Sequence, residues 1–240
     1  MTQAEPKSIV FIHGSGSNGA TWAYQSRHFA PRHRVLAMDL PGHGRNRGQG
    51  MENIGAYASW VLAEIERERL ARPVVVGHSL GGAIAIQMAL RSPASVGALA
   101  LVGTGARLRV LPAFFEAIKT DYAQALSTIS GYVFSPSASG AIVTKALREM
   151  RKTPPEILLG DFAACDRFDA MQEITRIAQP TLIVVGRDDR MTPLKYSEFL
   201  HRNIVGSRLE IIENAGHMVM IEQPDRFNRT LQDFVDRLAE

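Results

Sequence analysis

The sequence has a single cysteine, Cys165, so a disulfide bond within the chain is excluded. A chain without disulfides fits a reducing compartment, and we expect Cys165 to pack in the interior, since no motif around it indicates a nucleophile. The chain lacks any apolar run of about 20 residues, the length that crosses a membrane. Residues 1–7 also lack the apolar core of a secretory signal. These absences predict a cytoplasmic protein without a membrane partner.

An excess of charge of one sign is missing as well. The 27 basic and 24 acidic side chains leave a net charge of +3, which is too small and too dispersed to indicate nucleic-acid binding. Hydrophobic residues make up 45% of the chain and charged residues 21%, as in ordinary globular proteins. With 240 residues, the chain is long enough to bury a sizeable core in one large α/β domain or two small ones.

Short apolar, β-branched runs recur along the chain, and each ends at a glycine or a polar turn. Runs of this kind without alternation are typical of strands buried on both faces of a parallel sheet. They predict strands at residues 8–12, 35–38, 74–76, 98–102, 181–185 and 209–212. Helical patterns lie between them, at residues 56–70, 82–90 and 224–238. The alternation predicts the α/β class, with a doubly wound, mostly parallel sheet.

One long stretch, residues 104–176, breaks this alternation. It contains only helical patterns rich in Phe, Leu, Ile and Ala, without a convincing strand. A loop of this length without structure of its own would be unusual in a globular domain. We therefore predict a helical lid at residues 104–176, inserted into a core formed by residues 1–103 and 177–240.

The strongest motif is Gly77-His78-Ser79-Leu80-Gly81, which matches the pattern G-x-S-x-G. It lies directly after a predicted strand and before a helical run, as a nucleophile elbow does. The sharp turn would force the serine to a positive φ, and small residues two positions before and after it would let the backbone approach closely. The motif predicts that Ser79 is a nucleophile. The plainer alternative is a tight turn in which Ser79 only caps the helix.

A serine hydroxyl needs a base to remove its proton and a carboxylate to orient that base. Among the seven histidines, His217 is favoured because it follows the last predicted strand, although a solvated loop histidine is the alternative. Two acids, Asp188 and Asp189, follow the strand at residues 181–185, and the residues alone do not separate them. The order serine, aspartate, histidine is the one expected in this kind of sheet.

The loop Ile12-His13-Gly14-Ser15-Gly16 leaves the first predicted strand and is rich in glycine. We expect the backbone N–H groups of Ser15 and Leu80 to bind the negative charge that develops on an attacked carbonyl oxygen. A phosphate-binding loop is a weak alternative, because the P-loop lysine and the G-x-G-x-x-G pattern are both absent. His13 and His78 are expected to support loops by hydrogen bonds. This chemistry predicts neither a metal nor an organic cofactor.

Taken together, these motifs resemble the α/β-hydrolase superfamily, in its esterase-like branch with a helical lid. The matching segments are residues 13–14, 39–44, 77–82, 186–189, 216–217 and 222–224. The resemblance implies that the acid is the fourth residue of a G-x-x-D string, which favours Asp189 over Asp188. Some members carry the acid after the strand equivalent to residues 98–102, but here Gly103-Thr104-Gly105 has none.

The resemblance also narrows the chemistry. A serine nucleophile argues against the epoxide hydrolase and dehalogenase relatives, which use aspartate. Met218 stands where similar carbon–carbon bond hydrolases have an aromatic residue. This difference makes carbon–carbon bond hydrolysis a less favoured activity without excluding it. Residues 40–48 are similar to a segment of pimeloyl-carrier-protein methyl ester esterases. Basic side chains of the insert would then meet an acidic acyl carrier protein, or simply form a solvated helix face. They are Arg107, Arg109, Lys145, Arg148, Arg151 and Lys152.

The resulting hypothesis is a serine carboxylic ester hydrolase that acts on a small to medium, largely apolar acyl ester. Four side chains are expected to bind the acyl group, although some of the apolar insert residues must form its core: Leu111, Phe115, Phe134 and Met218. The alternatives within enzymes are a lactonase, a thioesterase, a carbon–carbon bond hydrolase and a cofactor-free haloperoxidase-like activity. Outside enzymes, the alternative is a non-catalytic ligand receptor, because a fold does not fix a function.

Overall fold

Six parallel strands form one sheet within residues 6–238, the range that this computed structural model describes. They are β1 (Ser8–Ile12), β2 (Arg34–Ala37), β3 (Val74–His78), β4 (Ala98–Val102), β5 (Thr181–Gly186) and β6 (Arg208–Ile212). Their spatial order is β2-β1-β3-β4-β5-β6. The predicted parallel sheet is confirmed, with strand ends shifted by at most two residues. Most of the segment at residues 1–7, for which no secretory signal is predicted, lies outside the described range.

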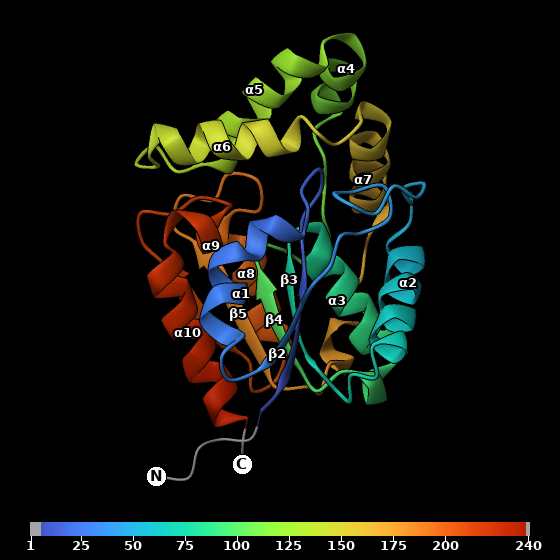
Figure 1. The fold of residues 1–240 in the computed structure, drawn as a ribbon, viewed down its shortest axis with the longest axis vertical. Helices are drawn as coiled ribbons and strands as arrows, with labels where there is room; N and C mark the ends of the chain where they lie inside the picture. The colour runs from blue at the N-terminus through green and yellow to red at the C-terminus, as the bar shows by residue number, and fades with distance from the viewer. Residues whose placement is uncertain (1–5, 239–240) are drawn as a thin grey trace.

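Helices cover both faces of the sheet (Figure 1). They are α1 (Ala23–Phe29), α2 (Ile54–Arg67), α3 (Leu80–Arg91), α8 (Leu194–Asn203), α9 (Val219–Glu222) and α10 (Pro224–Arg237). Val10 points into the apolar layer shared with α2, α3 and α8, and its neighbour Phe11 points into the opposite layer with α1, α9 and α10. Because successive strand residues face opposite sides, both layers demand apolar side chains, which explains the unbroken apolar runs.

Local capping explains where the covering helices begin. The Asn53 side chain accepts hydrogen bonds from the backbone N–H groups of residues 55 and 56, so α2 begins at Ile54, two residues before the predicted start. Helix α10 begins at Pro224 as predicted. Helices α1 and α8 are not predicted from the sequence. In α8 only Ser197 and Leu200 are buried, so its pattern is mostly polar. None of the helices in residues 6–238 is both long and apolar enough to cross a bilayer.

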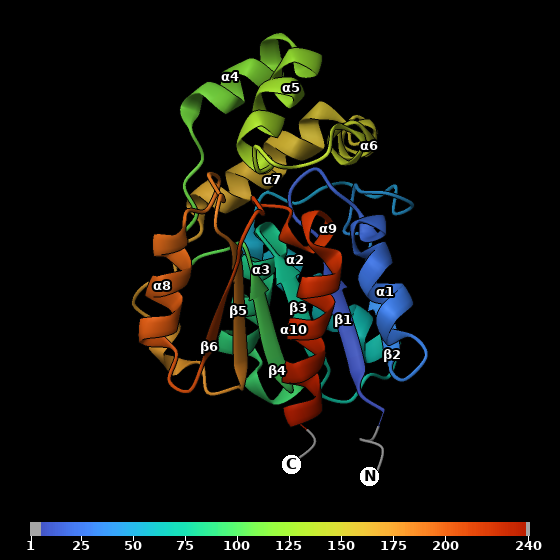
Figure 2. The same cartoon turned by 90° about the vertical axis from the view of Figure 1, so that its left-hand side faces the viewer.

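Between β4 and β5 the structure places α4 (Pro112–Thr120), α5 (Tyr122–Val133), α6 (Gly140–Met150) and α7 (Pro155–Arg167). All of them lie within the stretch predicted to be helical. Figures 1 and 2 show these helices above the carboxyl ends of the strands. They share an apolar cluster of their own, which includes Phe114, Leu126, Leu158 and Phe162. This segment therefore forms a second layer over the edge of the sheet where the candidate site residues lie.

The helices of this segment differ in how firmly they are embedded. Helix α6 has no fully buried residue. Helix α7, in contrast, also places Ala164 and Cys165 in the apolar layer between the sheet and helices α2, α3 and α8. The two ends of the segment meet in an isolated antiparallel bridge between Arg107 and Asp169. The chain thus leaves and re-enters the sheet layer through one narrow neck.

Candidate active site

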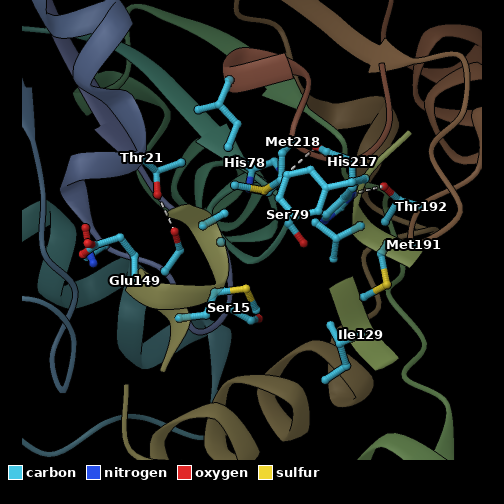
Figure 3. A pocket seen from close by; sticks show the side chains of 18 of the residues that line it. Ser15, Thr21, His78, Ser79, Ile129, Glu149, Met191, Thr192, His217 and Met218 are labelled. Carbon is cyan, nitrogen blue, oxygen red and sulfur yellow. Dashed lines mark hydrogen bonds between the residues drawn. The ribbon is translucent and has the colours of Figure 1, made fainter. Parts of the chain in front are cut away.

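Ser79 occupies the turn between β3 and α3, with φ of 53° and ψ of −115°. A positive φ costs a residue with a side chain about 1–3 kcal/mol, so the surroundings must hold it. The Ser79 N–H donates a hydrogen bond to the Val102 carbonyl at 2.9 Å, and the Thr104 hydroxyl donates to the Ser79 carbonyl at 2.8 Å. The positive φ expected of a nucleophile elbow is confirmed, and Ser79 lines a cavity (Figure 3).

Glycines let three backbone segments meet at this turn. A β-carbon on Gly77 would lie 2.2 Å from the Gly81 carbonyl oxygen, and one on Gly81 would lie 2.3 Å from that of Ile12. A β-carbon on Gly14 would lie 3.2 Å from the Ser79 Cβ. Larger residues at the first two positions would push the elbow apart, because both contacts are with backbone atoms. The loop that carries Ser15 therefore packs directly against the elbow.

His217 and Asp189 come together from the loops that follow β6 and β5. The His217 Nδ1 lies 2.9 Å from the Asp189 Oδ2, and both side chains are buried. The other carboxylate oxygen of Asp189 accepts the N–H groups of Met191 at 2.9 Å and Thr192 at 2.8 Å. The Thr192 hydroxyl donates to Oδ2 at 2.8 Å. With Nδ1 turned to the carboxylate, the His217 Nε2 is left as the nitrogen that can accept a proton.

The two competing acids have different surroundings. Burial pushes the pKa of the Asp189 carboxyl upward, but the facing His217 and the hydrogen bonds from His217 and Thr192 outweigh it and hold that pKa below its ordinary value. Asp188 instead accepts a hydrogen bond from the Ser135 hydroxyl at 2.7 Å. Of the two acids, Asp189 is the one in contact with His217, as the family pattern implies.

Ser79 and His217 line the same cavity, and Figure 3 shows their side chains next to each other on its wall. Among the hydrogen bonds of residues 6–238, none joins the Ser79 hydroxyl to the His217 ring. Catalytic hydrogen bonds are often long or misaligned in ligand-free proteins and tighten when substrate binds. The structure thus brings the predicted serine, histidine and aspartate to one site, with the aspartate–histidine contact already formed.

The loop that carries His217 is braced from two sides. The Glu222 carboxylate accepts the two N–H groups flanking His217, at 3.0 and 3.1 Å, and also the Ser135 N–H at 2.8 Å. Burial raises the pKa of Glu222 despite these three donors. The His217 N–H itself donates to the Val133 carbonyl at 2.7 Å. The end of α5 therefore helps to fix the backbone of the candidate base.

His13 and His78 support neighbouring loops, as the sequence predicts. The His78 Nε2 donates to the His217 carbonyl at 3.0 Å, and burial, with His217 nearby, holds the pKa of His78 well below its ordinary value. His13 contacts the Gly14 carbonyl through Nδ1 at 2.8 Å and accepts the Leu40 N–H at 3.1 Å. Burial lowers the pKa of His13 to about 4. Both rings are therefore neutral near pH 7 and act as fixed dipoles rather than charges.

The two predicted oxyanion donors lie beside Ser79. Leu80 is the first residue of α3, where a helix has no acceptor for its N–H groups, and Ser15 follows the Gly14 that packs on the elbow. Within the described residues, neither of these N–H groups donates a hydrogen bond to another protein group. Both N–H groups therefore remain without a protein acceptor in the described residues.

The cavity that Ser79 and His217 line has a volume of about 490 Å³. Figure 3 shows Ser79 between an apolar side, with Ile129, Met191 and Met218, and a more polar side, with Thr21 and Glu149. An ester with one apolar arm and one polar arm would fit this division. Within the described residues, no group of three His, Cys, Asp or Glu side chains is arranged to hold a metal ion.

Only half of the predicted acyl-binding residues line the cavity. Phe134 and Met218 do, whereas Leu111 and Phe115 do not. Leu111 precedes α4 and is 52% exposed, and Phe115 packs edge-on against Phe162 with ring centroids 6.2 Å apart. Further apolar residues of this segment line the cavity as well. They are Leu108, Ile129, Val133, Ile142, Leu158 and Phe162.

The six basic side chains predicted to meet a carrier protein divide into paired and unpaired groups. Arg107 and Arg109 lie 3.7 and 3.9 Å from Asp169, and Lys152 lies 2.7 Å from Glu149. The others make no ion pair within residues 6–238. They are Lys145, Arg148 and Arg151.

Comparison with known proteins places these features in a family. The model of the alpha/beta hydrolase family matches residues 9–230 of the chain. A pimeloyl-[acyl-carrier protein] methyl ester esterase from Neisseria meningitidis serogroup B is 30% identical over 245 residues, which cover 96% of this chain and 93% of that protein. A protein of the same name from Nitrosomonas europaea is 28% identical over 94% of both chains.

Solved structures show the same architecture. A thermophilic esterase superposes with a TM-score of 0.86 at 36% identity, covering 96% of this chain and 90% of that one. An esterase from Exiguobacterium antarcticum superposes with a TM-score of 0.91 at 23% identity, covering 97% and 93% of the two chains. The second likeness concerns the fold alone.

Proposed function

The chain belongs to the α/β-hydrolase family, and we propose that it is a serine carboxylic ester hydrolase that works through an acyl-enzyme on Ser79. One observation carries the proposal. A buried His217–Asp189 pair, joined at 2.9 Å, lies on the wall of the same cavity as a serine held at a positive φ. A metal ion or organic cofactor has no part in the proposed steps.

The first half of the reaction forms the acyl-enzyme. The Ser79 oxygen attacks the ester carbonyl carbon while the His217 Nε2 takes the hydroxyl proton. The carbonyl oxygen becomes negative and accepts hydrogen bonds from the N–H groups of Ser15 and Leu80. Asp189, whose pKa lies below its ordinary value, stays ionised and stabilises the charged imidazolium. His217 then gives its proton to the departing alcohol.

The second half releases the acid. A water molecule enters in place of the alcohol, His217 takes one of its protons, and the water oxygen attacks the acyl carbon. The tetrahedral intermediate uses the same two N–H donors and collapses when His217 returns the proton to the Ser79 oxygen. Residues 104–176 act in this proposal as a lid that covers the cavity and limits the water near the acyl-enzyme.

The proposed substrate is an ester with a small to medium, largely apolar acyl group. The apolar wall near Ser79, including Phe134 and Met218, and the volume of about 490 Å³ support this size. An acyl carrier protein is the proposed carrier of that group. It is supported by relatives named as esterases of pimeloyl-[acyl-carrier protein] methyl ester. Three cations that make no ion pair within residues 6–238 also support it: Lys145, Arg148 and Arg151.

The test is the hydrolysis of p-nitrophenyl butyrate by the wild-type protein and by Ser79→Ala. We expect turnover to fall by about 10³- to 10⁶-fold in the variant, because the nucleophile is lost while the folded cavity remains. A fluorophosphonate probe should label the wild type at Ser79 and leave the variant unlabelled. A variant that retains near-wild-type turnover would refute the proposal, and absence of labelling in an active protein would do so too.

The carrier is tested separately with two substrates that share one acyl methyl ester. In one substrate the acyl group is attached to an acyl carrier protein, and in the other it is a small thioester without the carrier protein. We expect kcat/KM to be higher for the carrier-bound ester. Replacing Arg148 and Arg151, which do not line the cavity, with serine should remove that advantage while leaving hydrolysis of the free ester unaffected. Equal values for the two substrates would restrict the function to small esters, and faster hydrolysis of a lactone of equal size would favour a lactonase.

A further inference from the structure

A buried carboxylate on α7 takes no part in the proposed reaction. Asp161 is 0% exposed, in a helix that otherwise buries apolar or small residues such as Leu158, Phe162 and Ala164. Burial of a carboxylate is strongly unfavourable unless hydrogen-bond donors surround it. The groups that meet Asp161 therefore indicate what this position does.

Three donors from three different segments meet this carboxylate. The Asp161 Oδ2 accepts the Gly16 N–H at 2.9 Å and faces the His43 Nε2 at 2.9 Å. Its Oδ1 accepts the Tyr57 hydroxyl at 2.7 Å. Gly16 follows β1, His43 lies in the loop after β2, and Tyr57 belongs to α2. Figure 1 shows α7 beside the loop between β2 and α2, above the sheet.

The hydrogen bonds of His43 fit its charged form. Its Nδ1 faces the Pro41 carbonyl oxygen at 3.0 Å and its Nε2 faces Asp161, so both ring nitrogens have acceptors and both can carry a proton. Burial alone would lower the pKa of His43, but the hydrogen bond and the charge of Asp161 outweigh it and raise that pKa. The fully buried contact between His43 and Asp161 thus anchors α7 to the sheet layer.

The backbone of Gly16 is held at both ends from the same helical segment. Its N–H meets Asp161, and its carbonyl oxygen accepts the Thr153 hydroxyl at 3.1 Å. Gly16 has φ of 64°, and a β-carbon there would lie 2.9 Å from a methyl group of Leu158. Its neighbour Ser15 carries one of the two proposed oxyanion donors. The orientation of that donor therefore depends on side chains at residues 153–161.

We propose that Asp161 is a positioning residue of the oxyanion hole, which holds the Gly16 N–H and so aims the Ser15 N–H at the reacting carbonyl oxygen. The inference deepens the proposed function and rests on it. Its consequence is that α7 belongs to the fixed frame of the reaction.

The experiment compares wild type with Asp161→Ala, Asp161→Asn, Thr153→Val and a matched control, Tyr57→Phe. The control removes one donor to Asp161 but leaves the Gly16 contact in place. Turnover of p-nitrophenyl butyrate is divided by the concentration of fluorophosphonate-reactive Ser79, so that unfolded protein does not count. The inhibition constant of butyl boronic acid, whose adduct on Ser79 places an oxygen in the oxyanion hole, is measured in parallel.

We expect Asp161→Ala to lower kcat by about 10- to 100-fold with KM changed by less than about threefold, because misaimed donors act mainly on the transition state. The boronic acid should bind more weakly by a similar factor. Thr153→Val should show the same pattern at about 3- to 10-fold, and Tyr57→Phe should stay within about twofold of wild type. Asp161→Asn keeps an oxygen for the Gly16 N–H and should retain more activity than Asp161→Ala.

Several results would overturn the proposal. One is unchanged kcat and boronic acid binding in Asp161→Ala. Another is a loss that lies in KM alone, which would assign Asp161 to substrate binding. If Asp161→Ala does not fold, Thr153→Val decides, and an unchanged kcat in that variant refutes the inference. Failure of the proposed function is distinguishable, since the wild type would then neither hydrolyse the ester nor react with the fluorophosphonate.

Discussion

Helices α6 and α7 belong to the same segment above the sheet, yet they are attached to the molecule in different ways. Helix α7 buries Leu158, Asp161 and Phe162 and is bonded through Asp161 to three other segments. Helix α6 buries no residue completely, although Ile142 and Lys145 reach the cavity. This difference in burial shows that the helices above the sheet are not all attached to the core in the same way. In the proposal above, α7 extends the frame that holds Ser15, whereas α6 contributes only partly buried residues to the cavity wall.

The largest effect is expected from Leu158→Ala in α7. The side chain is 0% exposed and fills the space beside Gly16, so its truncation should lower the free energy of unfolding by about 2–5 kcal/mol. Urea denaturation followed by circular dichroism measures the change. A loss of less than about 1 kcal/mol would contradict the firm attachment of α7.

A pH-dependent effect of intermediate size is expected from His43→Gln. The pKa of His43 is raised in the folded protein. Its pairing with Asp161 therefore stabilises the folded state fully at pH values below the pKa of His43 in the unfolded chain, near 6.5. That stabilisation is lost as the pH rises through the higher folded pKa. The facing His13, with a pKa of about 4, stays neutral throughout this range.

The difference in unfolding free energy between wild type and His43→Gln should therefore be largest at about pH 6 and shrink towards pH 9. Urea denaturation at a series of pH values measures it. Lys145→Gln, on the outer helix, serves as a control whose difference from wild type should not change with pH in this way. A difference for His43→Gln that grows with rising pH would mean that the charged pair does not stabilise the fold.

The smallest effect on stability is expected from Ile142→Ala in α6. The side chain is only partly buried, so the free energy of unfolding should fall by less than about 1 kcal/mol. Because Ile142 lines the cavity, KM for p-nitrophenyl butyrate should rise by about two- to fivefold with kcat nearly unchanged. Steady-state kinetics separate the two constants. A fall in kcat of tenfold or more would place α6 in the reaction frame and remove the contrast with α7.

The sequence predicts the parts of the site whose geometry is local. The turn around Ser79 follows from two glycines and a strand–helix junction, so its positive φ is predictable and confirmed. The acid and the base lie far apart in the chain. The order of strands and motifs nevertheless places Asp189 and His217 at the same edge of a parallel sheet, where their contact is found.

Features that depend on packing between helices cannot be predicted from the sequence. The composition of residues 111–120 does not tell which of their side chains meet the cavity, and neither Leu111 nor Phe115 lines it. Asp161 was missed because no motif surrounds it. The available signal was one acid in the otherwise uncharged run at residues 157–165. Its partners at residues 16, 43 and 57 are brought to it only by the tertiary fold.

The neck at Arg107 and Asp169 has a consequence for exchanging parts between relatives. Because the segment enters and leaves at one bridge, that bridge is where it would be cut out and replaced. A graft taken from this protein at that bridge would carry Asp161 but leave Gly16, His43 and Tyr57 behind in the donor. A chimera that keeps full turnover must therefore transplant both halves of this anchor together.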